Sequence, residues 1–77
     1  MQAATLAALQ QARTKRTAVA LATRLSDAAE GLVYRDRAAG PLGADAAIVA
    51  AARRALDIGK SETVDIGGQK IFLNVYV

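Results

Sequence analysis

The segment that most restricts how this chain can fold is residues 17–25, which read Thr-Ala-Val-Ala-Leu-Ala-Thr-Arg-Leu. In an extended strand, neighbouring side chains point to opposite faces, so Val19 and Leu21 share one face while Ala20 and Ala22 share the other. A strand that is apolar on both faces belongs in the interior of a sheet, and its alanines leave room for a helix to lie close. The segment therefore predicts a central strand beneath a helix.

Two other segments predict helices. Residues 3–14 are rich in alanine and carry leucines at helical spacing. Residues 45–58 carry an apolar stripe of helical period. Asp45 is suited to cap the start of that helix, and Gly59 is suited to end it.

Three further strands are predicted over residues 32–37, 61–66 and 70–77, the last two joined as a hairpin across a Gly-Gly turn. The order of elements is then α-β-β-α-β-β. We expect one small α+β domain over residues 1–77, with the two helices packed on one face of a mixed sheet.

The interior of so short a chain leaves little margin of stability. A chain of 77 residues can bury about 60% of its surface. Roughly 110 kcal/mol of hydrophobic burial then opposes about 115 kcal/mol of ordering entropy. The sequence has no cysteine and no histidine, which excludes disulfides, thiolate zinc sites and the usual catalytic base. A partner surface is the remaining stabiliser, so we expect a homo-oligomer or a partner protein.

Composition also limits the class of function. The net charge is +3, and the chain has only two tyrosines and one phenylalanine, few for stacking on nucleic-acid bases. The longest apolar run is far shorter than the ~20 residues that span a bilayer. The first residues lack the basic region of a signal peptide. We expect a cytoplasmic chain that binds neither nucleic acid nor membrane.

The candidate catalytic side chains do not form a recognisable set. Ser26 and Ser61 have no histidine to activate them. Asp27 and Glu30 are close in sequence but lie in a predicted turn, and a pair of catalytic carboxylates needs a cleft that a chain of this size rarely provides. An enzyme acting alone is therefore not expected.

One candidate binding site lies in the loop over residues 40–45. Gly40, Gly43 and Asp45 stand where this loop enters the second predicted helix. The backbone N–H groups at a helix start can hold an anion. The simpler interpretation is that Asp45 only caps the helix.

A second candidate is a set of arginines. Arg24, Arg35 and Arg37 come from neighbouring elements on either side of one turn and can converge on an acidic ligand or partner. The alternative is that they are solvated side chains at strand ends. Residues 13–16 form a short basic cluster at the end of the first helix, where cations suit the free carbonyl groups.

The last strand is apolar up to the final residue, ending Leu-Asn-Val-Tyr-Val. This pattern predicts a domain boundary, or a strand that continues into a partner. The alternative is a C-terminal strand that simply ends.

Four stretches carry a resemblance to a known family: residues 6–13, 19–23 (Val-Ala-Leu-Ala-Thr), 40–56 and 70–77. In this order they resemble the N-terminal domain of the xanthine dehydrogenase accessory family, the XdhC/CoxI type. The resemblance covers most of the chain. In that family the last strand leads into a linker and then a Rossmann-like second domain, which is absent from this sequence.

The resemblance implies an accessory protein that binds molybdenum cofactor and delivers it to a molybdoenzyme such as xanthine or carbon monoxide dehydrogenase. The family commonly has a Gly-Gly-Cys element where this chain reads Gly43-Ala44-Asp45, so no thiolate can meet molybdenum. We therefore expect no tightly bound cofactor. If an anionic pterin binds, the expected residues are Gly40, Gly43, Asp45, Arg24, Arg35 and Arg37. The alternative is a non-catalytic interaction or oligomerisation module that kept the fold and lost the cofactor site.

Overall fold

The two helices and four strands predicted from the sequence occur in the predicted order, and the structure adds a two-residue strand and a 3-10 helix before the second α-helix. The computed structural model describes residues 3–76, so Val77, the end of the predicted last strand, lies outside the described residues. The elements in chain order are α1 (Ala3–Thr14), β1 (Val19–Arg24), β2 (Glu30–Val33), β3 (Ala38–Ala39), the 3-10 helix η1 (Pro41–Ala44), α2 (Ala46–Ile58), β4 (Glu62–Ile66) and β5 (Gln69–Tyr76). The predicted α+β class is confirmed.

The five strands form one sheet in the order β3-β2-β1-β5-β4. β1 is the central strand, as its apolar faces predicted, with Ala20 opposite Val33 of β2 on one side and Val75 of β5 on the other. Each neighbouring pair of strands is antiparallel. The prediction of a mixed sheet was therefore wrong, because short turns reverse the chain between β1 and β2, β2 and β3, and β4 and β5.

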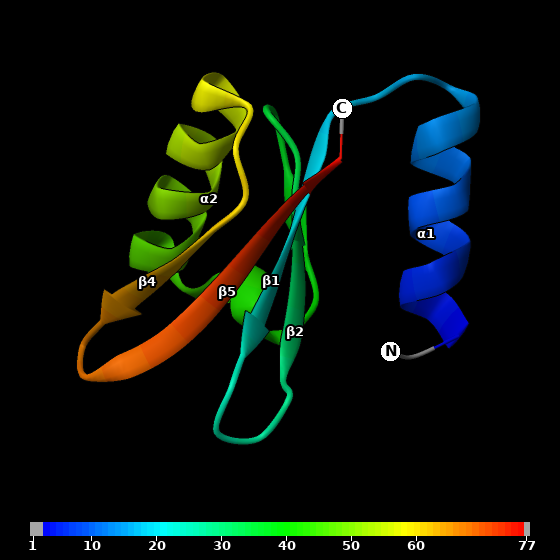
Figure 1. The fold of residues 1–77 in the computed structure, drawn as a ribbon. Coiled ribbons are helices and arrows are strands. Elements are labelled where there is room, and N and C mark those ends of the chain that lie inside the picture. Colours follow the sequence, from blue (N-terminus) through cyan, green and yellow to red (C-terminus); the bar gives the residue numbers. More distant parts are fainter. Residues whose placement is uncertain (1–2, 77) are drawn as a thin grey trace.

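The two helices lie on opposite faces of the sheet (Figure 1). α2 packs on the face that carries Ala20 and Ala22, together with Leu73 of β5. α1 packs on the face of Val19 and Leu21. The prediction that both helices share one face was wrong, because β1 has apolar side chains on both sides and each face needs its own cover.

Capping residues determine the two ends of α2, and two glycines form the turn of the last hairpin. Asp45 Oδ1 accepts hydrogen bonds from the backbone N–H groups of Ala47 at 2.9 Å and Ile48 at 3.3 Å, so the predicted cap is confirmed. Gly59 ends the helix in the left-handed conformation, with φ of 73°. Gly67 and Gly68 both have positive φ, as a type I′ hairpin turn requires.

The second strand is shorter and earlier than predicted. β2 ends at Val33, and the backbone N–H of Tyr34 donates to the carbonyl of Arg37 at 2.8 Å, which closes a turn. Arg35 and Arg37 therefore lie in or beside a turn and not along a strand. None of the helices within residues 3–76 combines the length and the apolar character needed to cross a membrane.

β5 shows how differently the two faces are covered, and this difference can be measured. Leu73 is fully buried on the α2 face, whereas its neighbour Phe72 is 37% exposed on the α1 face. We expect Leu73→Ala to lower the free energy of unfolding by about 2–5 kcal/mol, because it leaves a cavity. The matched variant Phe72→Ala is expected to cost less than half as much in urea unfolding. Equal losses would show that both faces are equally well packed.

Candidate functional site

The residues expected to hold an anion lie at two ends of the sheet. In the antiparallel pair of β1 and β2, Thr23 lies opposite Glu30 and Ala20 lies opposite Val33. Arg24 therefore stands beside the turn between β1 and β2, while Arg35 and Arg37 stand at the opposite end. The three arginines do not converge.

Loop 40–45 lies at the same end of the sheet as Arg24. Its glycines are explained by close contacts with neighbouring backbone, not by a ligand. Gly40 has a φ of +83°, and a Cβ there would lie 3.1 Å from the carbonyl oxygen of Glu30. A Cβ on Gly43 would lie 3.3 Å from Ala38, and one on Gly31 would lie 2.7 Å from the backbone nitrogen of Gly43. Only glycines allow η1 to lie this close to β2 and β3.

Asp45 occupies the position that an anion would take at the start of α2. Its carboxylate already accepts hydrogen bonds from two of the N–H groups at this helix start. It also places a negative charge where a phosphate would bind. The geometry gives no support to an anionic pterin at this loop, and binding of molybdenum cofactor stays a prediction of the resemblance.

Arg24 is engaged with its own turn. Its Nε donates to Asp27 Oδ1 at 2.9 Å, its Nη2 donates to Asp27 Oδ2 at 2.7 Å, and its Nη1 donates to Gln69 Oε1 at 3.2 Å. These hydrogen bonds from Arg24, helped by the N–H of Ala29, lower the pKa of Asp27 to about 2. The paired guanidinium ties the β1–β2 turn to the β4–β5 hairpin.

Arg35 and Arg37 also have partners of their own. Arg35 Nη1 forms an ion pair with Asp57 Oδ1 of α2 at 2.7 Å. The guanidinium of Arg37 lies 3.9 Å from the ring centroid of Tyr34, and its Nη1 lies 3.6 Å from Asp36 Oδ1. Both arginines thus contact charged or aromatic side chains beside the turn after β2. Since each pair is exposed, it contributes little to stability.

A hollow region of the described surface that the sequence did not predict is a groove between α1 and β5. We call it the α1–β5 groove. Its volume is about 860 Å³. It is lined by Leu6, Leu9, Gln10, Ala12, Arg13, Arg16, Thr17, Val75 and Tyr76.

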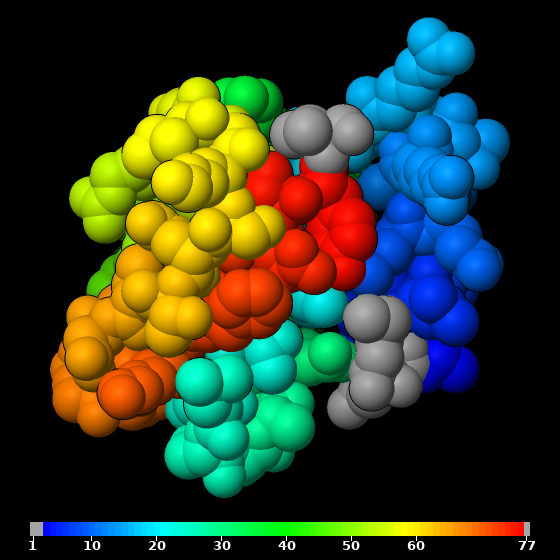
Figure 2. All heavy atoms as spheres, in the orientation of Figure 1, coloured from blue at the N-terminus to red at the C-terminus, as the bar shows by residue number. Residues whose placement is uncertain are grey.

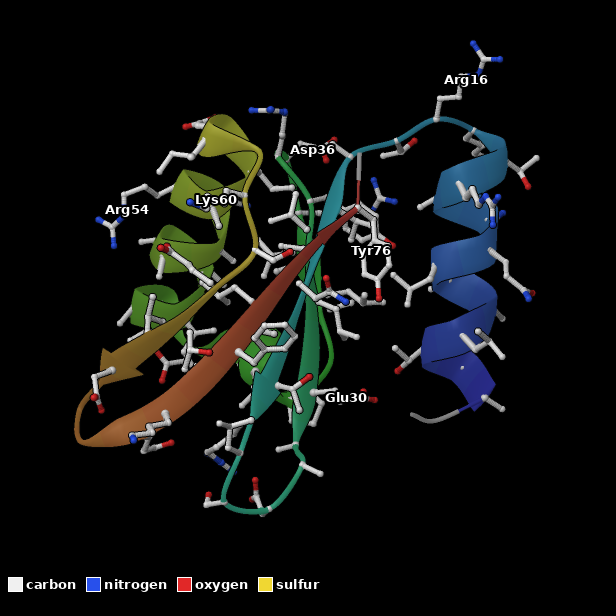
Figure 3. The ribbon with its side chains drawn as sticks, viewed as in Figure 1. Arg16, Glu30, Asp36, Arg54, Lys60 and Tyr76 are labelled. Carbon is white, nitrogen blue, oxygen red and sulfur yellow. The ribbon has the colours of Figure 1, made fainter. Side chains whose placement is uncertain are left out.

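Exposed apolar side chains mark the α1–β5 groove and the sheet surface beside it. Leu6 of α1 is 49% exposed, and Phe72 and Tyr76 of β5 are each 37% exposed. Figure 2 shows the side chains of β5 (red) open to the surface between α1 (blue) and the β4 side of the sheet. Tyr76 points from β5 into the space on the α1 side (Figure 3). Such a patch of exposed apolar side chains is typical of an interaction surface.

A short network of hydrogen bonds holds the β5 wall of the groove in order. Ser61 Oγ accepts from the backbone N–H of Val75 at 2.9 Å and donates to Asn74 Oδ1 at 3.1 Å. Asn74 Nδ2 in turn donates to the hydroxyl oxygen of Tyr76 at 2.7 Å. Tyr76 is therefore positioned before any partner arrives. The sequence offered one signal for this wall, the alternation that puts Phe72, Asn74 and Tyr76 on one side of the last strand.

Within residues 3–76, no group of three acidic side chains gathers in a way that could hold a metal ion. Neither a scan against protein-family models nor a search of curated proteins found a match to this chain. The resemblance to the XdhC/CoxI family therefore stays a prediction.

The role of Asp45 as a cap can be tested directly. Asp45→Ala removes the acceptor of both N–H groups and is expected to lower the free energy of unfolding by about 1 kcal/mol. Asp45→Asn keeps an acceptor oxygen and is expected to stay within about 0.5 kcal/mol of the wild type. Urea unfolding measures both. If Asn costs as much as Ala, the charge of Asp45 matters and the cap interpretation fails.

Proposed function

We propose that this chain is a non-catalytic interaction module that receives a polypeptide partner in the α1–β5 groove. The observation that carries the proposal is the unequal cover of the two faces of the sheet. On one face, α2 and η1 together bury the side chains of the central strands. On the other face, α1 lies over β1 and β2 and leaves β5 open.

Alternate residues of β5 differ in exposure according to the face of the sheet on which they lie. Ile71 and Leu73 are fully buried on the α2 face, while Phe72 and Tyr76 on the α1 face keep more than a third of their surface in water. Aromatic side chains in a concave, ordered surface are the kind that contribute most to protein–protein binding. A partner that covers them removes apolar area from water at roughly 25 cal/mol per Å².

A partner in the groove would also stabilise the packing of α1 on the sheet. Its one buried apolar residue is Ala12, with Ala8 and Leu9 partly buried against β1 and β2. Leu6 is half exposed at the groove. A segment seated in the groove would pack on both α1 and β5 and hold the helix on the sheet. This agrees with the expectation that so small an interior relies on a neighbour.

The other expectations stay predictions. A role in delivery of molybdenum cofactor rests on the family resemblance, and no contact among residues 3–76 favours it. A molybdoenzyme or a second copy of the chain would each be a polypeptide partner of the kind proposed. A cytoplasmic location and a lack of enzymatic activity stay expectations from the sequence.

The proposal is tested by crosslinking from within the groove. A photoreactive amino acid at position 6 is expected to capture a defined polypeptide in the cells that produce the chain, while the same group at position 54, on the outer side of α2, is not. The captured protein is identified by mass spectrometry, purified and titrated with this chain. We expect Tyr76→Ser to weaken that binding at least tenfold, or about 1.4 kcal/mol, and Arg54→Gln to leave it unchanged.

Two results would contradict the proposal. One is the absence of any polypeptide crosslinked from position 6. The other is a purified partner that binds wild type and Tyr76→Ser equally well, provided that the amide spectrum shows Tyr76→Ser to be folded.

A further inference from the structure

We propose that the α1–β5 groove takes a single acidic, amphipathic α-helix of a partner protein. This inference rests on the proposed function and adds the chemical class of the partner. It is drawn from the width of the open surface, the spacing of its apolar side chains and the sign of its charges.

The open part of the sheet is about one helix wide. Neighbouring strands lie about 4.8 Å apart and a helix with its side chains is about 10 Å across, so one helix covers roughly two strands. α1 covers β1 and β2 on its face, which leaves β5 and the edge strand β4. A second helix beside α1 would complete this layer, as α2 and η1 complete the other (Figure 1).

The apolar side chains of the open surface are spaced to suit a helix. Phe72 and Tyr76 lie on the same face of β5, four residues apart, which in a strand is about 13 Å. Positions i and i+7 or i+8 of a helix lie about 11–12 Å apart on one side. Leu6 of α1 borders the other side of the groove. A helix of three to four turns with an apolar stripe therefore fits between the two walls.

The charged residues that line the groove, Arg13 and Arg16, are both basic. Neither forms an ion pair within the described part of the chain, and neither does the adjacent Lys15. Arg16 lies in the loop just after the C-terminal end of α1, and its side chain points away from the sheet (Figure 3). A partner helix with carboxylates at this end would supply the missing counter-charges.

The whole end of the molecule around these arginines is basic. Of the ten basic residues, only Arg24 and Lys70 lie toward the other end. The acidic residues at the basic end are Asp36 and Asp57, and these lie against Arg37 and Arg35. Asp27, Glu30, Asp45 and Asp65 belong to the opposite half of the molecule, and Glu62 lies opposite Leu73 near the middle of β5. This separation favours an acidic partner and aids its approach.

A second copy of this chain suits the groove less well. Its own α1 would bring the same basic cluster, residues 13–16, without a carboxylate in the helix. A single-stranded nucleic acid carries the right charge, but the α1 wall of the groove is lined by aliphatic side chains, Leu6, Leu9 and Ala12. Stacking of successive bases needs a row of aromatic rings, and Tyr76 is the one aromatic side chain among the residues that line the groove.

The test uses three synthetic helical peptides, each about 16 residues long, or roughly 24 Å as a helix. All three carry the same leucine stripe, and the remaining positions are mainly glutamate, glutamine or lysine. Binding to the full chain is followed by fluorescence anisotropy, and its place by amide shifts near Leu6 and Tyr76. We expect the glutamate peptide to bind at least tenfold more tightly than the other two.

Charge variants then assign the preference to the groove. The double variant Arg13→Glu, Arg16→Glu is expected to reverse the preference for the glutamate peptide, so that the lysine peptide binds best. Arg54→Glu with Lys60→Glu changes the net charge by the same amount away from the groove and is expected to keep the preference for the glutamate peptide. Raised salt is expected to weaken the glutamate peptide most.

The outcomes separate this inference from the proposed function. Equal binding of all three peptides in the groove would overturn the acidic preference and leave the interaction module standing. No binding of the glutamate peptide at about 1 mM would overturn the inference. Tighter binding of an oligothymidylate, or a dimer in light scattering that Tyr76→Ser dissolves, would overturn it in favour of nucleic acid or a second copy.

Discussion

The fold depends on the alternation of large and small apolar side chains along β1. Val19 and Leu21 point to one face of the sheet, and Ala20 and Ala22 point to the other, so both faces must be covered. Hydrogen bonding to both β2 and β5 fixes β1 at the centre of the sheet. Each helix then takes one face, and the sheet separates them.

The same alternation makes the two faces unequal. Ala20 and Ala22 let α2 approach through its own alanines, Ala52 and Ala55, which are fully buried. α1 meets larger side chains on the opposite face and buries little of itself there. The well-packed face supplies the stability of the fold, and the open face supplies a surface on which another chain can dock. The proposed function therefore follows from the packing of the central strand.

The sequence predicted the features that local chemistry decides. Asp45 and Gly59 bound α2 because capping depends on a few neighbouring groups, and a Gly-Gly turn defines the last hairpin. The side on which each helix packs was not predicted, although the apolar faces of residues 17–25 held the information. The prediction that the arginines converge was wrong for a related reason. Arg24 and Arg35 are close in sequence, but the register of β1 and β2 places them at opposite ends of the sheet.

Amide hydrogen exchange on the isolated chain measures how firmly each helix is held to the sheet. We expect amides of α1 to exchange through local opening at a free energy at least ~1 kcal/mol below that of α2, β1 and β5, which open only with global unfolding. Equal protection of α1 and α2 would contradict the claim that the α1 face is incompletely packed.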